Sequence, residues 1–386
     1  MFAMPRSLLL ATTAVIGVSG SAAAEKQTVG LVLTEWHLAT VETPDAKAEC
    51  PDGFQWGNVD NWKALYPNQA DQDEMHREHG FTQHRGKNGE NVFVYPWTGH
   101  DPLPFREIAN DVSYGADLDG VGSGEETPKT CKHENFNGID GRENVDNQLY
   151  RVLGCQKALR RGGFYDARFS EEKKMRLMAR WLVEITDVDS LENDDHVVIN
   201  TYKGRDKLVA DAAGNVLPWI SQRVDERGPR FMQTTTGRIV DGVLYSDPVH
   251  LVFSTATHNL VGETDILDAQ FELKLSETAA EGIIVGYHDL DAWWKQYTKQ
   301  SMSREHVTPV SGPSVWEAAV RLADGHKDPA TGQCTAISTA YEVKFTRAFI
   351  VREFDSPDVA TAPDAAPSSG EHKRAAAESS PNAGGL

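Results

Sequence analysis

Residues 114–155 read YGADLDGVGSGEETPKTCKHENFNGIDGRENVDNQLYRVLGC, and the rest of the chain can be organised around this segment. It contains two clusters of aspartate and glycine, Asp117–Gly120 and Asp140–Asn147, together with Cys131 and Cys155. Short acidic side chains beside glycines can turn back so that several oxygens converge, which is the arrangement that calcium prefers. The same residue types also make ordinary turns, because Asp and Asn bond their own backbone and Gly adopts positive φ. The segment therefore predicts either a bound calcium ion or a set of structural turns.

A calcium site here would draw its ligands from both clusters. An EF-hand is excluded, because position twelve counted from Asp117 is Pro128 and the bidentate Glu of that motif is missing. The expected site is therefore a structural calcium ion, with a backbone carbonyl as a further ligand. The side chains that we expect to hold it are Asp117, Asp119, Asp140, Asp146 and Asn147.

The first 24 residues have the pattern of a secretory signal peptide. Arg6 precedes an apolar run from Leu8 to Val18, and Ala22-x-Ala24 forms a cleavage box. The apolar run is too short to span a bilayer comfortably. We therefore expect an exported protein, periplasmic or extracellular in a bacterium, without a membrane span.

The charge balance excludes one class of partner. Removing residues 1–24 takes away a single positive charge from the formal net charge of −19, which leaves −20. Nucleic acids and anionic membranes are bound by positive charge that displaces counterions. An acidic chain of this kind is not expected to bind nucleic acid.

The cysteines predict disulfides. There are four, Cys50, Cys131, Cys155 and Cys334, and an even number in an exported chain suggests two bridges, for which three pairings exist. We favour Cys131–Cys155, which would close a local loop around the Asp/Gly clusters. The second bridge would then be Cys50–Cys334, which joins the two ends of the chain.

The second half of the chain is rich in short β-strand patterns separated by turn residues. Six or more such strands favour a β-rich α+β fold with an antiparallel, jelly-roll-like β-sandwich. The expected organisation is a signal peptide (1–24), a loop-rich, disulfide-closed segment ending in a helix (25–165), a sandwich domain with inserted helices (166–354) and a disordered tail (355–386). The expected strands of the sandwich are Val197–Tyr202, Arg230–Thr236, Val249–Ser254, Gln270–Leu275, Gly282–Val285 and Ile337–Val351.

Three helices are predicted. The first covers Asn144–Arg161, where apolar residues recur at helical spacing and Gly162 follows. The second begins at Asp289, whose side chain can cap it. The third begins at Ser314, which forms a capping-box pattern with Glu317.

A histidine cluster supports an alternative function. His76, His79 and His84 are close in sequence, and His at i and i+3 can share a helical face and bind a transition metal. This favours an envelope enzyme, either a glycan hydrolase or a metal-dependent enzyme. Against it, the chain contains no G-x-S-x-G, P-loop, G-x-G-x-x-G or H-E-x-x-H motif.

Several short motifs follow one another along the chain: Tyr114-Gly115, Asp117–Gly120, Thr130–His133, Asp140-Gly141, Asp146–Arg151 and Gly332–Ser338. Their order resembles that of a group of exported bacterial proteins of unknown function. The resemblance implies an exported protein and supplies no catalytic residues, since no activity is established for the group. One motif differs, because Asn137–Gly141 reads N-G-I-D-G where the group has S-P-D-G.

The sequence as a whole favours a non-enzymatic protein. We expect a calcium-stabilised binding or structural module of the bacterial envelope or exterior. The sequence does not identify the partner, for which a polysaccharide and another envelope protein are the candidates. The envelope enzyme that uses the histidine cluster stays as the alternative.

Overall fold

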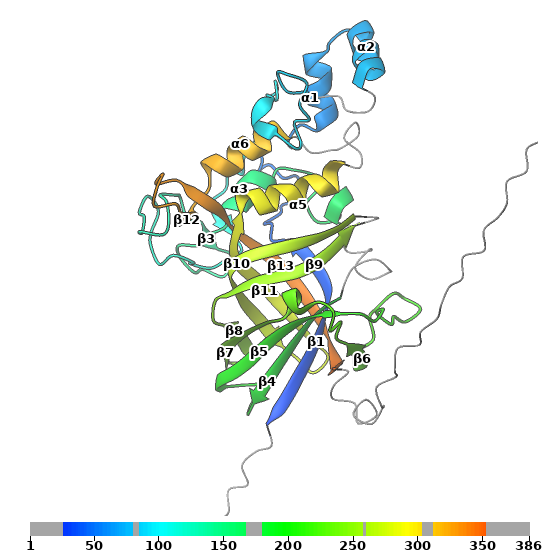
Figure 1. Cartoon of the computed structure of the whole chain (residues 1–386). Helices are drawn as coiled ribbons and strands as arrows, with labels where there is room; N and C mark the ends of the chain where they lie inside the picture. Colours follow the sequence, from blue (N-terminus) through cyan, green and yellow to red (C-terminus); the bar gives the residue numbers. More distant parts are fainter. Residues whose placement is uncertain (1–25, 80–84, 167–179, 258–259, 303–311, 353–386) are drawn as a thin grey trace, which may run out of the picture.

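The computed structural model describes residues 26–79, 85–166, 180–257, 260–302 and 312–352. Strands make up most of the regular structure in this part of the chain, and the helices are few (Figure 1). The predicted signal peptide and the predicted tail both lie outside the described residues. No helix within the described ranges is long and apolar enough to cross a membrane.

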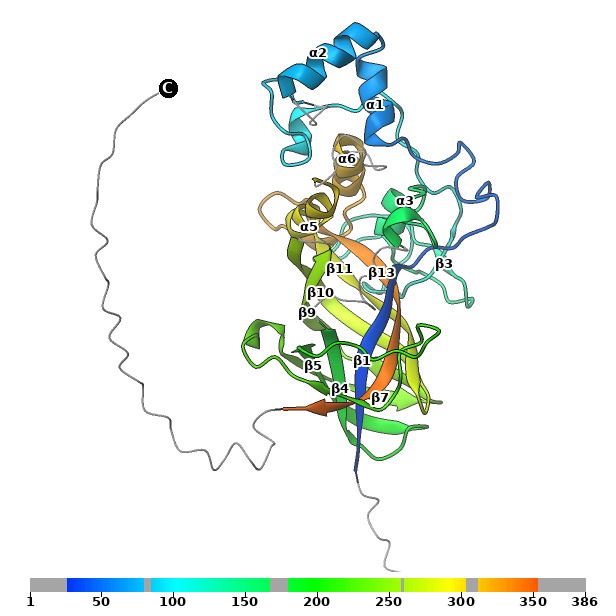
Figure 2. The same ribbon diagram turned by 90° about the vertical axis from the view of Figure 1, so that its right-hand side faces the viewer.

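Eight strands form a closed antiparallel β-barrel (Figures 1 and 2). Each strand pairs with the next one in chain order, and the first also pairs with the last, which closes the ring and leaves no open edge. In order around the barrel the strands are β1 (Gln27–Leu38), β4 (Arg180–Val188), β5 (Asp194–Gly204), β7 (Gln233–Val240), β8 (Val243–Ser246), β10 (Leu260–Leu275), β11 (Ala279–Asp289) and β13 (Cys334–Val351).

The core of the barrel is built by alternate residues of its strands. Successive side chains of a strand point to opposite faces, so every second residue can point inward. In β1 the inward set is Val29, Leu31 and Leu33, and in β4 it includes Trp181 and Val183, all of which are buried in one cluster. Burying apolar surface of this kind, at roughly 25 cal/mol per Å², is the main contribution to the stability of the barrel.

The prediction of a β-sandwich was wrong. Period-two alternation shows that a strand has one buried face, and this is equally true in a sandwich and in a barrel. The architecture is decided by the pairing of β1 with β13, in which Leu31 lies opposite Arg347 and Leu38 opposite Tyr341. These partners lie near opposite ends of the chain, so local patterns carry no information about their contact.

Three further strands extend the barrel sheet. β9 (Val249–Thr257) pairs with the first part of β10 and places Leu251 and Phe253 in the barrel core. β6 (Ile220–Arg223) runs parallel to the end of β13. β12 (Gly325–Lys327) pairs with the beginning of β13.

The chain between β1 and β4 forms a long insertion, although β1 itself belongs to the barrel. A helix of the insertion, α3 (Gln148–Leu153), packs with two helices from later in the chain, α5 (Leu290–Met302) and α6 (Pro313–Arg321). The three helices form one buried cluster at one end of the barrel (Figures 1 and 2). The described elements of the insertion are α1 (Asn58–Leu65), α2 (Gln69–His79), η1 (Pro96–Thr98), β2 (Val112–Ser113), β3 (Asn137–Gly138) and α3 (Gln148–Leu153). A short turn, η2 (Pro229–Phe231), lies elsewhere, before β7.

The predicted start of α5 is confirmed. The backbone N–H of Ala292 donates to the Asp289 carboxylate at 2.9 Å, as expected for a helix cap. The predicted cap of α6 was wrong, because the helix already begins at Pro313 and Ser314 lies inside it. Both the N–H and the hydroxyl of Ser314 donate to Asp101, which comes from the insertion.

The predicted helix over residues 144–161 is shorter in the structure, where α3 covers only Gln148–Leu153. Residues on either side of it are held by other contacts instead. Val145 forms a β-bridge with Phe136, and Gln156–Leu159 forms a turn.

The cysteines form two disulfides, but the predicted pairing was wrong. Cys50 bonds to Cys155 and Cys131 bonds to Cys334, which closes chain separations of 105 and 203 residues. The first bridge lies in a small buried cluster with Phe136 inside the insertion. The second joins the Asp/Gly segment to the start of β13. Sequence spacing could not distinguish these pairings, because the fold brings together residues that are far apart in the chain.

Candidate functional site

A cavity of about 140 Å³ lies at the end of the barrel that α5 covers, and we call it the barrel-end cavity. Its walls come from β1, β4, β9, β10, β11, β13 and α5, with smaller contributions from the insertion. Apolar surface dominates the walls. The aromatic residues that line the cavity are Trp36, Trp181, Phe253, Trp293, Tyr297 and Tyr341.

The aromatic side chains of the barrel-end cavity are held in pairs. The Trp36 ring stacks on Tyr341 with centroids 4.3 Å apart, and the Trp181 ring stacks on Phe253 at 4.8 Å. Phe253 also meets Trp36 edge to face at 5.0 Å. Contacts of this kind fix ring positions, since offset-stacked and edge-to-face pairs are favoured geometries. The barrel end is therefore lined by aromatic rings that hold one another in place.

His288 is buried beside this cavity and is neutral. Burial lowers its pKa to about 4. Its Nδ1–H donates to the Asp265 carbonyl at 2.7 Å, which leaves Nε2 to accept from the hydroxyl of Tyr341 at 2.7 Å. Both ring nitrogens are therefore satisfied within the protein.

His37 is the second histidine of the cavity wall, and it carries charge more readily. Burial alone would lower its pKa, but hydrogen bonds to the carboxylates of Asp166 and Glu35 outweigh this effect and raise it. Asp166 also accepts from the N–H of Gly162 at 2.9 Å. His37 and Asp166 thus form an ion pair in which each side chain meets the hydrogen-bonding needs of the other.

Unlike the ring nitrogens of these histidines, the indole nitrogen of Trp181 is unpaired within the described part of the chain. Trp181 is 3% exposed, and its indole N–H has no hydrogen-bond partner among the described residues. A buried donor without a partner costs free energy on the order of 1–3 kcal/mol. Trp181 also lines the cavity, so this N–H is an unsatisfied donor at the cavity wall.

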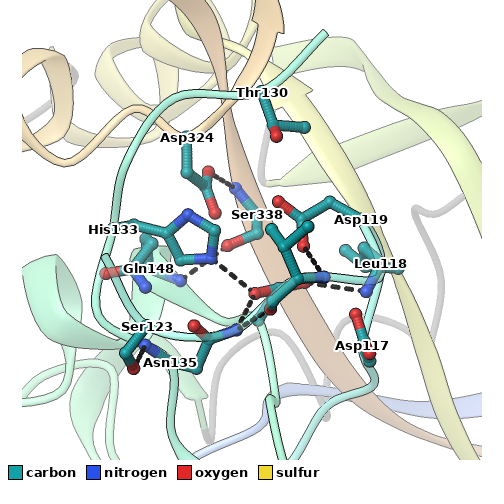
Figure 3. A network of polar contacts seen from close by, with 12 residues as sticks. Asp117, Leu118, Asp119, Ser123, Thr130, His133, Asn135, Gln148, Asp324 and Ser338 are labelled. Atoms are coloured by element: carbon teal, nitrogen blue, oxygen red, sulfur yellow. Dashed lines mark hydrogen bonds and ion pairs between the residues drawn. The ribbon is translucent and has the colours of Figure 1, made fainter. Parts of the chain in front are cut away.

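A second candidate site lies in the Asp/Gly segment, where Asp119, His133 and Asp146 converge. Figure 3 shows Asp119 and His133 among their polar neighbours. One ligand atom from each residue lies within 4.8 Å of the others. The His133 Nε2 and a carboxylate oxygen of Asp146 are 2.7 Å apart. We call these three residues the Asp–His–Asp cluster.

The position of Asp146 at the centre of this cluster is fixed by several donors. Its carboxylate accepts from the N–H of Leu118 at 2.7 Å and from the Asn135 amide at 3.0 Å, in addition to His133. Gly115 allows the backbone to pass close by, because a Cβ there would lie 2.9 Å from the Asp146 carbonyl oxygen and its φ is +151°. The local fold of the loop therefore brings the side chain of Asp146 to the His133 ring.

Both partners of this pair have shifted pKa values. Burial alone would lower the pKa of His133, but the hydrogen bonds to Asp146 and to the Cys131 carbonyl raise it to about 9. Burial raises the pKa of Asp146, which is fully buried. The imidazole therefore carries a proton at neutral pH in the metal-free protein.

Asp324 lies on the other side of the His133 ring, with its carboxylate pointing toward it (Figure 3). It is 1% exposed, and burial raises its pKa to about 7. One of its oxygens accepts from the N–H of Ser338 at 2.7 Å, and the other has no hydrogen-bond partner among the described residues. The N–H of Cys131 donates to the Asp324 carbonyl at 2.8 Å, which ties the two chain segments together.

The structure divides the five predicted calcium ligands among separate places. Asp119 and Asp146 meet in the cluster, but Asp117 is exposed and accepts from the N–H of Gly120 in a turn. Asp140 pairs with Arg142, which also makes a bidentate ion pair with Glu272 of β10. The amide of Asn147 donates to the hydroxyl of Ser113 and the carbonyl of Tyr114.

His133 is the member of the cluster that the sequence analysis missed. It follows Cys131 in the T-C-K-H motif and lies between the two acidic clusters, which was the available signal. The other predicted metal site cannot be compared with the structure in the same way. His84 lies outside the described residues, and His76 and His79 belong to α2, where their side chains are not described.

No protein-family model, no curated protein and no solved structure matches this chain. The candidate sites are therefore interpreted from their own chemistry.

Proposed function

We propose that this protein is an exported, non-enzymatic binding module that holds one small, mostly apolar molecule in the barrel-end cavity. The observation that carries the proposal is the chemistry of the cavity walls. Stacked aromatic rings surround free space, while the neighbouring histidines are already paired with other protein groups. Such a site favours a neutral guest over a reacting substrate, since neither histidine has a free ring position prepared for proton transfer.

The size of the cavity limits the guest. An apolar cavity of about 150 Å³ accommodates benzene. The barrel-end cavity, at about 140 Å³, is therefore suited to a molecule with one aromatic ring or a short aliphatic chain. A hydrogen-bond acceptor on that molecule would satisfy the N–H of Trp181.

Export is supported by two features. The two disulfides are typical of proteins that fold in an oxidising compartment. The N-terminal apolar run has the pattern of a signal peptide. A cavity of this volume holds about one aromatic ring, so the predicted polysaccharide or envelope-protein partner would have to contact the outer surface instead. That partner stays a prediction.

The experiment compares two probes of similar size, acetophenone and ethylbenzene, by quenching of tryptophan fluorescence. We expect both to bind one to one. Trp181→Phe keeps the ring but removes the N–H, and it should weaken acetophenone binding about fivefold, the equivalent of one neutral hydrogen bond. Ethylbenzene affinity should change little.

A second pair of variants tests the location. Ala292 lines the cavity from α5, so Ala292→Phe should fill it and abolish binding of both probes. The preceding residue, Asp291, is exposed, and Asp291→Phe adds the same side chain outside the cavity. If Ala292→Phe and Asp291→Phe bind the probes equally well, or if neither probe saturates the unmodified protein, the proposal is wrong.

A further inference from the structure

We infer that the Asp–His–Asp cluster is a binding site for a divalent transition-metal ion, held by the Nε2 of His133 and by carboxylate oxygens of Asp119 and Asp146. This site is separate from the barrel-end cavity and does not depend on its ligand. Three features of the described residues support it, and each concerns a different part of the cluster.

The first feature is the orientation of the imidazole. The Nδ1 of His133 lies 2.9 Å from the carbonyl oxygen of Cys131, so Nδ1 carries a proton and donates it. The lone pair of the deprotonated ring is then on Nε2, which faces Asp146 and Asp119. Histidines that bind metals are commonly held in this way, with the second ring nitrogen donating to a backbone carbonyl.

The second feature is an excess of buried acceptor atoms. One oxygen each of Asp119, Asn135 and Asp324 is buried without a hydrogen-bond partner among the described residues. Asp119 contributes its other oxygen to the N–H of Val121 at 3.1 Å, which orients the carboxylate. Buried acceptors are normally satisfied, and a cation satisfies several of them together.

The third feature is charge. Three carboxylates, those of Asp119, Asp146 and Asp324, lie near a single imidazole; Asp146 and Asp324 are buried, and Asp119 is partly exposed. Even with His133 protonated, ionising all three acids would leave the group with a net negative charge, and burial raises the pKa values of Asp146 and Asp324 in the absence of a cation. A bound divalent ion would replace the imidazole proton and supply the missing positive charge.

The donor set indicates the class of metal. One imidazole nitrogen with carboxylate oxygens suits zinc, manganese, iron or cobalt. Calcium takes six to eight oxygen ligands and rarely uses nitrogen. Of the five side chains predicted to bind calcium, Asp119 and Asp146 belong to the cluster, whereas Asp117 and Asp140 bond to Gly120 and Arg142.

The test uses untagged, EDTA-treated protein with its disulfides intact. Cobalt(II) is titrated first, because it reports its ligands through visible absorption, and zinc is then added as a competitor. We expect one cobalt per chain, with an absorption spectrum that zinc abolishes. Calcium at the same concentrations should compete at most weakly.

Two variants of the same loop locate the site. Asp119→Asn keeps the acceptor for Val121 but removes the charge, and it should weaken cobalt binding more than about tenfold. Asp117→Asn is the matched control and should leave the affinity unchanged. Circular dichroism checks the folding of both variants, and the cobalt spectrum of the unmodified protein tests the inference even if a variant does not fold.

Two outcomes would overturn the inference. If neither cobalt nor zinc binds the unmodified protein, the cluster is a structural histidine–carboxylate pair. If only calcium binds, and Asp117→Asn weakens it as much as Asp119→Asn does, the ion is held by the acidic loop and not by the Asp–His–Asp cluster.

Discussion

The barrel-end cavity and the Asp–His–Asp cluster are both buried, but their polar atoms are paired in opposite ways. Around the cavity, His288 bonds to Tyr341 and His37 to Asp166, and apolar space is left between aromatic rings. In the cluster, acceptor oxygens outnumber donors. The first arrangement suits a neutral molecule and the second suits a cation. The two regions are therefore expected to bind different ligands independently.

The largest expected effect on stability comes from removing the disulfides, and the two bridges should affect the two regions differently. The first double variant, Cys131→Ser with Cys334→Ser, opens a loop of 203 residues. The second, Cys50→Ser with Cys155→Ser, opens a loop of 105 residues. Each double variant should lower the free energy of unfolding by about 5 kcal/mol in the chain-entropy description. Urea denaturation measures this loss.

Only the first of these double variants should also weaken cobalt binding. Cys131 supplies the carbonyl that orients His133, and its disulfide joins this loop to β13. Acetophenone binding to the folded fraction should persist in both. Equal losses of cobalt affinity in the two variants would contradict the separation of the sites.

The next effect concerns pH, because the histidines of the two regions titrate in opposite directions. The pKa of His288 is about 4 in the folded protein, against an ordinary value of 6.5. Between these values the unfolded chain binds a proton that the folded chain does not, so stability falls as the pH drops from 6.5 toward 4. The loss should reach about 3 kcal/mol.

His133 behaves in the opposite way, since its pKa is raised to about 9. Its contribution in the metal-free protein is complete below pH 6.5 and is lost as the pH rises toward 9. Urea denaturation of His288→Gln and the unmodified protein across pH 4–9 checks this. The variant should lack the acid-side loss and keep the alkaline one; parallel profiles would show that His288 is not the group responsible.

The smallest effect concerns Asp140, which the sequence placed in a calcium site. Arg142 links Asp140 to Glu272 on the barrel, and all three side chains are partly exposed. Arg142→Met should therefore lower the free energy of unfolding by only about 1–2 kcal/mol. Cobalt affinity should not change. A loss of cobalt binding in this variant would indicate that Asp140 takes part in the metal site after all.

Local features of the fold could be predicted from the sequence. The six strands predicted for the second half of the chain lie within or overlap strands of the structure, because alternation reports a buried face whatever the architecture. The strand predicted at Asn91–Tyr95 was wrong, because these residues form turns. The cap of α5 by Asp289 was also predictable, since donor and acceptor are three residues apart. The two acidic clusters do approach each other, through Asp119 and Asp146.

Features that depend on distant contacts could not be predicted in this way. The barrel is closed by β1 and β13, and α6 is capped by Asp101, which is 213 residues from Ser314. The disulfide pairing follows from the same long-range contacts. The acidic residues of the Asp–His–Asp cluster could be found in the sequence. That His133 belongs to the cluster and Asp117 does not depends on which loop residues face inward.

The most direct test of the account is a titration of cobalt and acetophenone into three proteins: the unmodified chain, Asp119→Asn and Ala292→Phe. We predict that the unmodified protein binds both ligands, each with an affinity that does not depend on the other. Asp119→Asn should lose only cobalt, and Ala292→Phe should lose only acetophenone. If either variant loses both ligands while remaining folded, the two regions are not the independent sites described above.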